Sequence, residues 1–115
     1  MNEYGLTPLR GVISATKMRN ALRALDPTLI FDLRNINING RLMGCSGFIT
    51  DPATGNIVYL STEDNPGPLL GHAVYRTAKH TKDYSGGLNH MCLCEDLPTN
   101  VIELLRKTRT LAHSA

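Results

Sequence analysis

The stretch of sequence that decides the fold covers residues 28–50 and reads TLIFDLRNININGRLMGCSGFIT. At its centre, Asn39-Gly40 tolerates a positive φ at both positions, as the two-residue type I′ turn of a β-hairpin requires. Because a two-residue loop fixes the register of the two strands, the hairpin can be written out pair by pair. The predicted pairs are Ile38 with Arg41, Ile36 with Met43, Phe31 with Phe48, and Ile30 with Ile49.

The second arm of this hairpin contains a weak strand segment, Gly44-Cys45-Ser46-Gly47, in which the predicted register sets Leu33 opposite Ser46. Glycine inside a strand is typical of a β-bulge or of a close approach between two backbones. We therefore predict one of these irregularities at residues 44–47.

The predicted register leaves apolar side chains on both sides of the hairpin. Phe31 and Phe48 fall on one side, whereas Ile30 and Ile49 fall on the other. An antiparallel sheet with one face in water normally alternates apolar and polar residues. We therefore expect the second face to be covered as well, and dimerisation through it is our preferred explanation.

A helix is predicted before the hairpin, because apolar residues there recur with the spacing of an amphipathic helix. These residues are Met18, Ala21, Leu22 and Leu25. Ser14 or Thr16 is available as the N-cap. Asp26-Pro27 ends the helix, since the residue before a proline is pushed out of the α region.

After the hairpin, strand-forming runs occupy residues 57–60, 72–78 and 88–94, with a long polar loop expected over 61–71. A second helix is expected from Pro98 or Asn100, with apolar residues at Val101, Leu104 and Leu105. The predicted fold is a single α+β domain over residues 1–115. It is a meander-like antiparallel sheet of about five strands, with the N-terminal and C-terminal helices packed on one face.

The composition is that of a folded globular protein, with 42% apolar and 19% charged residues. The first residues lack the charged and apolar regions of a signal peptide. No stretch approaches the ~20 apolar residues of a membrane span. We therefore expect a cytoplasmic protein without a membrane partner.

The charge balance excludes a strongly basic nucleic-acid binder, because 12 Lys and Arg against 10 Asp and Glu give a net charge of only +2. Any basic site must therefore be local. The sharpest candidate is an anion-binding segment that joins cationic side chains to hydrogen-bond donors ahead of two glycines. Its residues are Arg76, Lys79, His80, Lys82 and Tyr84.

The partner of such a segment could be a nucleic acid, a nucleotide or an acidic protein surface, and no phosphate-binding or RNA-binding motif distinguishes among them. A secondary basic patch consists of Arg10, Lys17, Arg19 and Arg23. A solvated loop and a solvated helix face remain the plain alternatives to both groups.

Cys45, Cys92 and Cys94 are expected to be free thiols, because the number is odd and no export signal is present. With His90 they offer the ligand types of a zinc site. However, His90 and Cys94 would lie roughly 13 Å apart along an extended strand. We therefore predict no metal and no cofactor, with Cys92 and Cys94 as small buried apolar groups.

Three functions stay open at this point. The first is a non-catalytic module that binds an anionic partner through the segment from Arg76 to Tyr84. The second is a protein-interaction or inhibitor module that acts through an exposed sheet face. The third is a small enzyme with Cys45 or Ser46 as nucleophile and His72, His80 or His90 as base, although no catalytic spacing identifies it.

Overall fold

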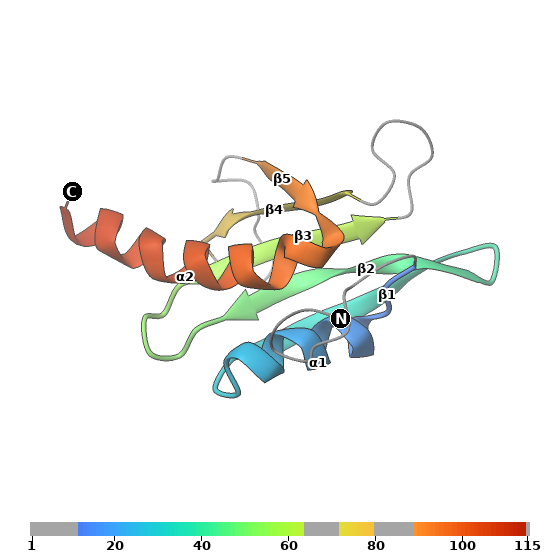
Figure 1. Cartoon of the computed structure of the whole chain (residues 1–115), viewed down its shortest axis with the longest axis horizontal. Coiled ribbons are helices and arrows are strands. Elements are labelled where there is room, and N and C mark those ends of the chain that lie inside the picture. The colour runs from blue at the N-terminus through green and yellow to red at the C-terminus, as the bar shows by residue number, and fades with distance from the viewer. Residues whose placement is uncertain (1–11, 64–71, 80–88, 115) are drawn as a thin grey trace.

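A computed structural model of the chain describes residues 12–63, 72–79 and 89–114. The elements in chain order are α1 (Ala15–Leu25), β1 (Ile30–Ile38), β2 (Arg41–Thr50), β3 (Ile57–Glu63), β4 (His72–Ala78), β5 (His90–Leu93), the short 3₁₀ helix η2 (Cys94–Asp96) and α2 (Leu97–Ser114). The strands form one antiparallel sheet in the order β1-β2-β3-β4-β5. Both helices lie on the same face of this sheet (Figure 1), so the predicted α+β fold is confirmed.

Helix α1 begins and ends where the sequence indicates. The side chain of Ser14 accepts a hydrogen bond from the backbone N–H of Lys17 at 3.1 Å and caps the first turn. Met18 and Leu22 are fully buried, as the spacing predicts. Leu25 is 39% exposed and does not belong to the buried stripe, because the helix ends at this residue.

The turn of the first hairpin is confirmed. Asn39 and Gly40 have φ values of 53° and 77°, and Ile38 pairs with Arg41 across the two-residue loop. The remaining predicted pairs are wrong, because the register shifts by one residue between Ile36 and Asn37. Met43 is the extra residue of this β-bulge on β2.

Beyond the bulge, Phe31 pairs with Ile49 and Ile30 with Thr50. A shift of one residue moves every side chain of a strand to the opposite face. The bulge therefore turns Cys45 and Ile49 toward the helices and Phe48 away from them. Without it, Ser46, Phe48 and Thr50 would face the helix layer, and Cys45 and Ile49 would face away from it.

The close backbone approach predicted at residues 44–47 occurs at Gly47. Leu33 of β1 pairs with Gly47 rather than with Ser46. A Cβ at Gly47 would collide with the Asp32 carbonyl oxygen and would lie 2.8 Å from the Leu33 Cα. The φ of 149° at Gly47 also lies where side chains are rarely accommodated.

The core lies between the sheet and the two helices. From the sheet it takes Cys45, Ile49, Val58, Leu60 and Ala73, and from the helices it takes Met18, Leu22, Leu97, Val101 and Leu105. The alternation along each strand sends these sheet residues to one face. We call this the helix face.

Three predicted boundaries are corrected. Strand β3 extends to Glu63, so residues 61–63 belong to the sheet, and residues 64–71 of the predicted loop lie outside the described residues. Strand β5 covers only His90–Leu93, because Asn89 lies before the strand and Cys94 already begins η2. Helix α2 starts one residue before Pro98. Among the described residues, no helix is long and apolar enough to cross a membrane.

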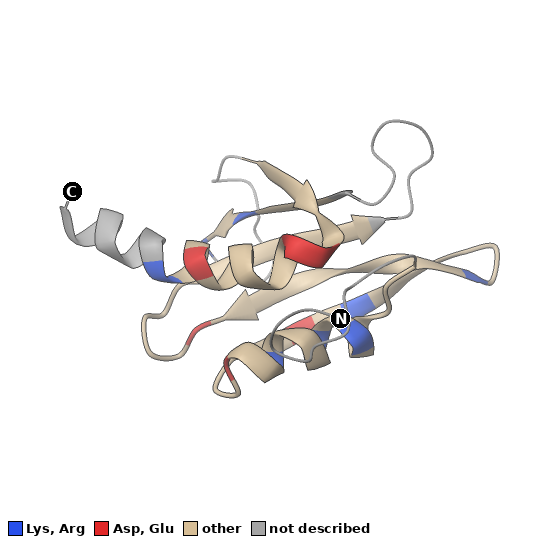
Figure 2. Ribbon diagram, viewed as in Figure 1, with Lys and Arg blue, Asp and Glu red and all other residues tan. Residues whose placement is uncertain are grey.

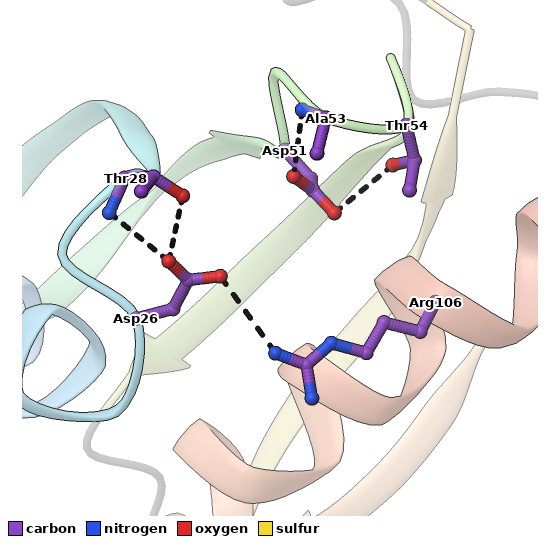
Figure 3. A network of polar contacts seen from close by, with 6 residues as sticks. All are labelled: Asp26, Thr28, Asp51, Ala53, Thr54 and Arg106. Carbon is purple, nitrogen blue, oxygen red and sulfur yellow. Dashed lines mark hydrogen bonds and ion pairs between the residues drawn. The ribbon is translucent and has the colours of Figure 1, made fainter.

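Polar contacts hold the rim of the helix layer (Figure 3). The Asp26 carboxylate, just after α1, accepts hydrogen bonds from the N–H and the hydroxyl of Thr28 and lies 3.8 Å from the Arg106 guanidinium of α2. In the β2–β3 turn, Asp51 accepts from the backbone of Ala53 and the hydroxyl of Thr54. The Asn56 amide then donates to the Leu105 carbonyl of α2, so this turn is tied to the C-terminal helix.

Candidate functional site: the open face of the sheet

The face of the sheet opposite α1 and α2 is the candidate site, and we call it the open face. Both helices contact the strands from the other side (Figure 1). Within residues 12–63, 72–79 and 89–114, no helix or strand covers the open face. Its side chains alternate with those of the core along every strand.

Four residues in continuous register form the centre of the open face, and we call them the central row. Asp32 on β1 pairs with Phe48 on β2, Phe48 with Tyr59 on β3, and Tyr59 with Arg76 on β4. The ring centroids of Phe48 and Tyr59 lie 5.2 Å apart with a tilt of 58°. Such tilted aromatic pairs are favourable beyond the apolar area that they bury. The central row thus places two aromatic rings between an acidic and a basic side chain.

The rows on either side of the central row are mainly apolar or small. One row runs Ile30, Thr50, Ile57 and Ala78, and the other runs Arg34, Ser46, Ser61, Val74 and Met91. The immediate neighbours of the aromatic pair are thus Thr50, Ile57, Ser46 and Ser61, whereas the other apolar residues of these rows, and the exposed Arg34, lie on the outer strands.

The exposed apolar side chains of the described residues concentrate on this side of the sheet. The large ones there are Ile30, Ile38, Met91 and Leu93, which are 57%, 45%, 53% and 43% exposed. The fifth, Leu25, is at the end of α1. The four on the sheet lie on its edges, with Ile30 and Ile38 at the two ends of the edge strand β1 and Met91 and Leu93 on the opposite edge strand β5.

The predicted cationic segment is described in part. Arg76 lies within β4, half-buried on the open face beside Tyr59. Lys79 is exposed just after the end of β4. His80, Lys82 and Tyr84 lie outside the described residues. Arg76 thus belongs to the central row, whereas Lys79 lies just outside the sheet.

The secondary basic patch lies on the helix side of the sheet. Lys17 is exposed on α1, and Arg19 is half-buried there. The guanidinium carbon of Arg23 lies 5.3 Å from the centre of the Phe31 ring, a cation–π contact that the sequence does not indicate. Arg10 lies outside the described residues.

These α1 cations and Arg76 lie on opposite faces of the sheet. Figure 2 shows the charges of both signs dispersed over the described elements. The described residues therefore do not gather the two predicted basic groups into one surface.

Cys45 and Cys94 are buried, whereas Cys92, predicted to be buried, is only half-buried. Cys45 is fully buried, and its Sγ lies 3.5 Å from the Thr62 hydroxyl. Burial raises the pKa of Cys45 and that of Cys92, and it raises the pKa of Cys94 to about 11. A protonated, inaccessible thiol is a poor nucleophile, so the geometry does not favour Cys45 in a catalytic role.

Ser46 and Cys45 point to opposite faces of β2. His90 lies on the helix face, where its ring stacks on Tyr75 at 5.1 Å. Among the described residues, no group of three or more His, Cys, Asp or Glu side chains is arranged to hold a metal ion.

The aromatic pair is the feature that the sequence analysis does not find. The predicted register sets Phe48 on the same side as Phe31, and Tyr59 lies in a run that indicates only a strand. With the bulge placed at Met43, the alternation along β2 and β3 sets both rings on the open face. Comparison with known proteins adds no relative, since no family model, no curated protein and no solved structure matches this chain.

Proposed function

We propose that this protein is a non-catalytic binding module whose open face docks a partner protein. The observation that carries this function is the set of apolar and aromatic side chains on a face that no described element covers. Apolar side chains are the main source of free energy when two protein surfaces associate. The tilted pair of Phe48 and Tyr59 supplies the kind of aromatic anchor that dominates such interfaces.

The direct test places a photo-crosslinker on the open face. Tyr59→p-benzoylphenylalanine keeps an aromatic side chain at the centre of the surface. Glu103→p-benzoylphenylalanine is the matched control, because Glu103 is exposed on α2, which lies on the other side of the sheet. Each variant is irradiated inside the cells that naturally produce the protein, and the adducts are identified by mass spectrometry.

A defined protein adduct at position 59 that position 103 does not give supports the proposal. Absence of any adduct at position 59, or the same adducts at both positions, contradicts it. An adduct at position 59 that nuclease removes and protease does not would also contradict it, because the partner would then be a nucleic acid.

A second proposal keeps the anion-binding function predicted from the segment between Arg76 and Tyr84. The observation that favours it is the position of Arg76 beside the Tyr59 ring, since an arginine next to an aromatic ring suits both phosphates and stacked bases. The partner class is a nucleic acid, a nucleotide or an acidic protein surface.

Salt dependence tests this second proposal. Binding to single-stranded oligonucleotides, duplex DNA and ATP is measured at low ionic strength and then in rising salt. Binding should weaken as salt rises, because released counterions drive the association, and Arg76→Ala should weaken it more than Arg106→Ala. Absence of binding at low ionic strength, or binding that is unchanged in high salt, would exclude the anion site.

A further inference from the structure

We propose that the partner of the open face is a second copy of this chain, packed about a two-fold axis parallel to the strands, with Asp32 of each copy paired with Arg76 of the other. This inference rests on the docking function proposed above and names the occupant of that surface. The feature that selects a second copy is the charge pattern of the central row.

The central row carries its opposite charges on opposite sides of the sheet centre. Asp32 lies on the edge strand β1, whereas Arg76 lies on β4, beyond the middle strand β3. The two side chains belong to strands three spacings apart, which is roughly 14 Å in a sheet. They therefore cannot pair with each other within one copy of the chain.

A two-fold axis parallel to the strands turns this pattern into a complementary one. With the axis midway between β2 and β3, β1 of one copy lies over β4 of the other, and β2 lies over β3. Asp32 then faces Arg76 of the second copy, because both belong to the central row, and the long arginine side chain spans the gap between the two sheets. Because the interface is isologous, the same ion pair forms twice.

The alternative symmetric packing is unfavourable. An axis that runs across the strands along the central row would set each strand over its own copy. Asp32 would then face Asp32, and Arg76 would face Arg76, and like charges brought together at an interface oppose binding. The charge pattern thus separates two arrangements that the apolar side chains alone would allow.

The centre of the open face suits a sheet-on-sheet contact. Phe48 and Tyr59 flank the proposed axis, so Phe48 of one copy lies over Tyr59 of the other. In the next row, Ser46 and Ser61 are small and leave room for rings from the opposite sheet. Two packed sheets lie ~10 Å apart and interleave their side chains in this way.

Charge exchange between two variants tests the pairing. Asp32→Arg and Arg76→Asp are prepared separately as full-length chains, and sedimentation equilibrium is measured over a range of concentrations. The wild-type chain of 12.6 kDa should reach twice that mass as concentration rises. Each variant alone should dimerise at least about tenfold more weakly, because like charges then meet at both symmetry-related contacts.

An equimolar mixture of the two variants should recover the wild-type affinity. In the mixed dimer, the two introduced side chains face each other at one contact, with opposite charges, and the native Asp32 faces the native Arg76 at the other. Arg106→Asp is the control, because Arg106 lies on α2 and away from the open face. It should dimerise like the wild type, and it should not restore affinity when mixed with Asp32→Arg.

Three results would overturn the inference: a wild-type chain that stays monomeric throughout, variants that dimerise as tightly as the wild type, or a mixture that stays as weak as its components. If Arg76→Asp does not fold, Tyr59→p-benzoylphenylalanine in the purified protein gives the answer instead. A dimer-sized adduct that joins position 59 to β2 of another copy supports the axis between β2 and β3, whereas an adduct that joins it to β3, or an irradiated sample that stays monomeric, refutes it.

The two proposals fail in different ways. A wild-type chain that is monomeric when purified, but whose position 59 reacts with a different protein in cells, contradicts the second copy and leaves the docking function standing. If position 59 gives neither a dimer-sized adduct in the purified protein nor a protein adduct in cells, the docking function itself is contradicted.

Discussion

The helix face and the open face are made by the same five strands, yet they differ in chemical character. The helix face presents aliphatic residues, Cys45 and the partly buried rings of Phe31 and Tyr75, and its buried polar residue Thr62 contacts the thiol of Cys45. The open face mixes aromatic, aliphatic and charged residues and has no described element above it. The two charges beside apolar groups are the features that the proposed docking of a second copy uses.

Adjacent residues of β3 give the sharpest test of this difference. Leu60 is fully buried on the helix face, and Leu60→Ala should lower the free energy of unfolding by about 2–5 kcal/mol through lost burial and the cavity left behind. Tyr59 is half-buried on the open face, and Tyr59→Ala should lower it by only about 1 kcal/mol, mainly through its contact with Phe48.

Urea denaturation at a low protein concentration measures both values on the monomer. The dimer affinity should show the reverse order, with Tyr59→Ala more damaging than Leu60→Ala in every sample that remains folded. Equal losses of stability for the two variants would mean that the open face is as much a part of the monomer core as the helix face.

The layers of this fold could be predicted well from the sequence, because the signals that define them are local. A positive φ at Asn39 and Gly40, an N-cap at Ser14 and the end of α1 before Pro27 each depend on a few neighbouring residues. The predicted bounds of strand β4 likewise agree with the observed ones. Such local chemistry can be recognised from the sequence without knowledge of the tertiary contacts.

The distribution of side chains between the two faces could not be predicted in the same way. It depends on the bulge at Met43, which is set by what the helices must bury rather than by any preference of Met43 itself. The predicted register is therefore correct at the turn and wrong for the rest of the hairpin. The candidate site escapes prediction for the same reason, because Phe48 and Tyr59 meet on the open face only after the shift.

Two glycines of the hairpin allow a packed strand position to be compared with a turn position. At Gly47, on the helix face, an added Cβ would meet the backbone of Asp32 and Leu33, and Gly47→Ala should cost about 2–3 kcal/mol. At Gly40, in the turn, nothing lies within 4 Å of the added Cβ, so Gly40→Ala should cost only about 1 kcal/mol through its positive φ.

Thermal unfolding of the two alanine variants, with the wild type alongside, measures this contrast. Hydrogen exchange shows which part of the hairpin each substitution destabilises, because Gly47→Ala should speed the exchange of amides along the whole β1–β2 ladder. Gly40→Ala should affect only amides close to the turn. A Gly40→Ala variant that is less stable than Gly47→Ala would show that β1 can move aside from β2 at little cost.

The smallest effect expected concerns the polar rim of the helix face. Two hydrogen bonds from Thr28, with a weaker contribution from Arg106, hold the pKa of Asp26 below its ordinary value of 3.8. Because the folded-state pKa is lowered, the ionised carboxylate stabilises the fold above pH 3.8, and this stabilisation is lost as the pH falls through the lowered value. Asp26→Ala should therefore be less stable than the wild type by on the order of 1 kcal/mol at pH 7.

The pH dependence of this difference identifies its cause. The difference in free energy of unfolding between the wild type and Asp26→Ala should narrow as the pH falls below 3.8. Protonation removes from the wild type the same ionised carboxylate that the substitution removes from the variant. Thr28→Val removes the hydroxyl donor, which is the largest cause of the lowered pKa of Asp26. The difference in free energy of unfolding between Thr28→Val and the wild type should therefore also narrow as the pH falls. Arg106→Ala should change the profile least, because the guanidinium is 65% exposed and its ion pair is long. A gap that stays constant from pH 7 to pH 2 would mean that Asp26 acts through its shape and not through its charge.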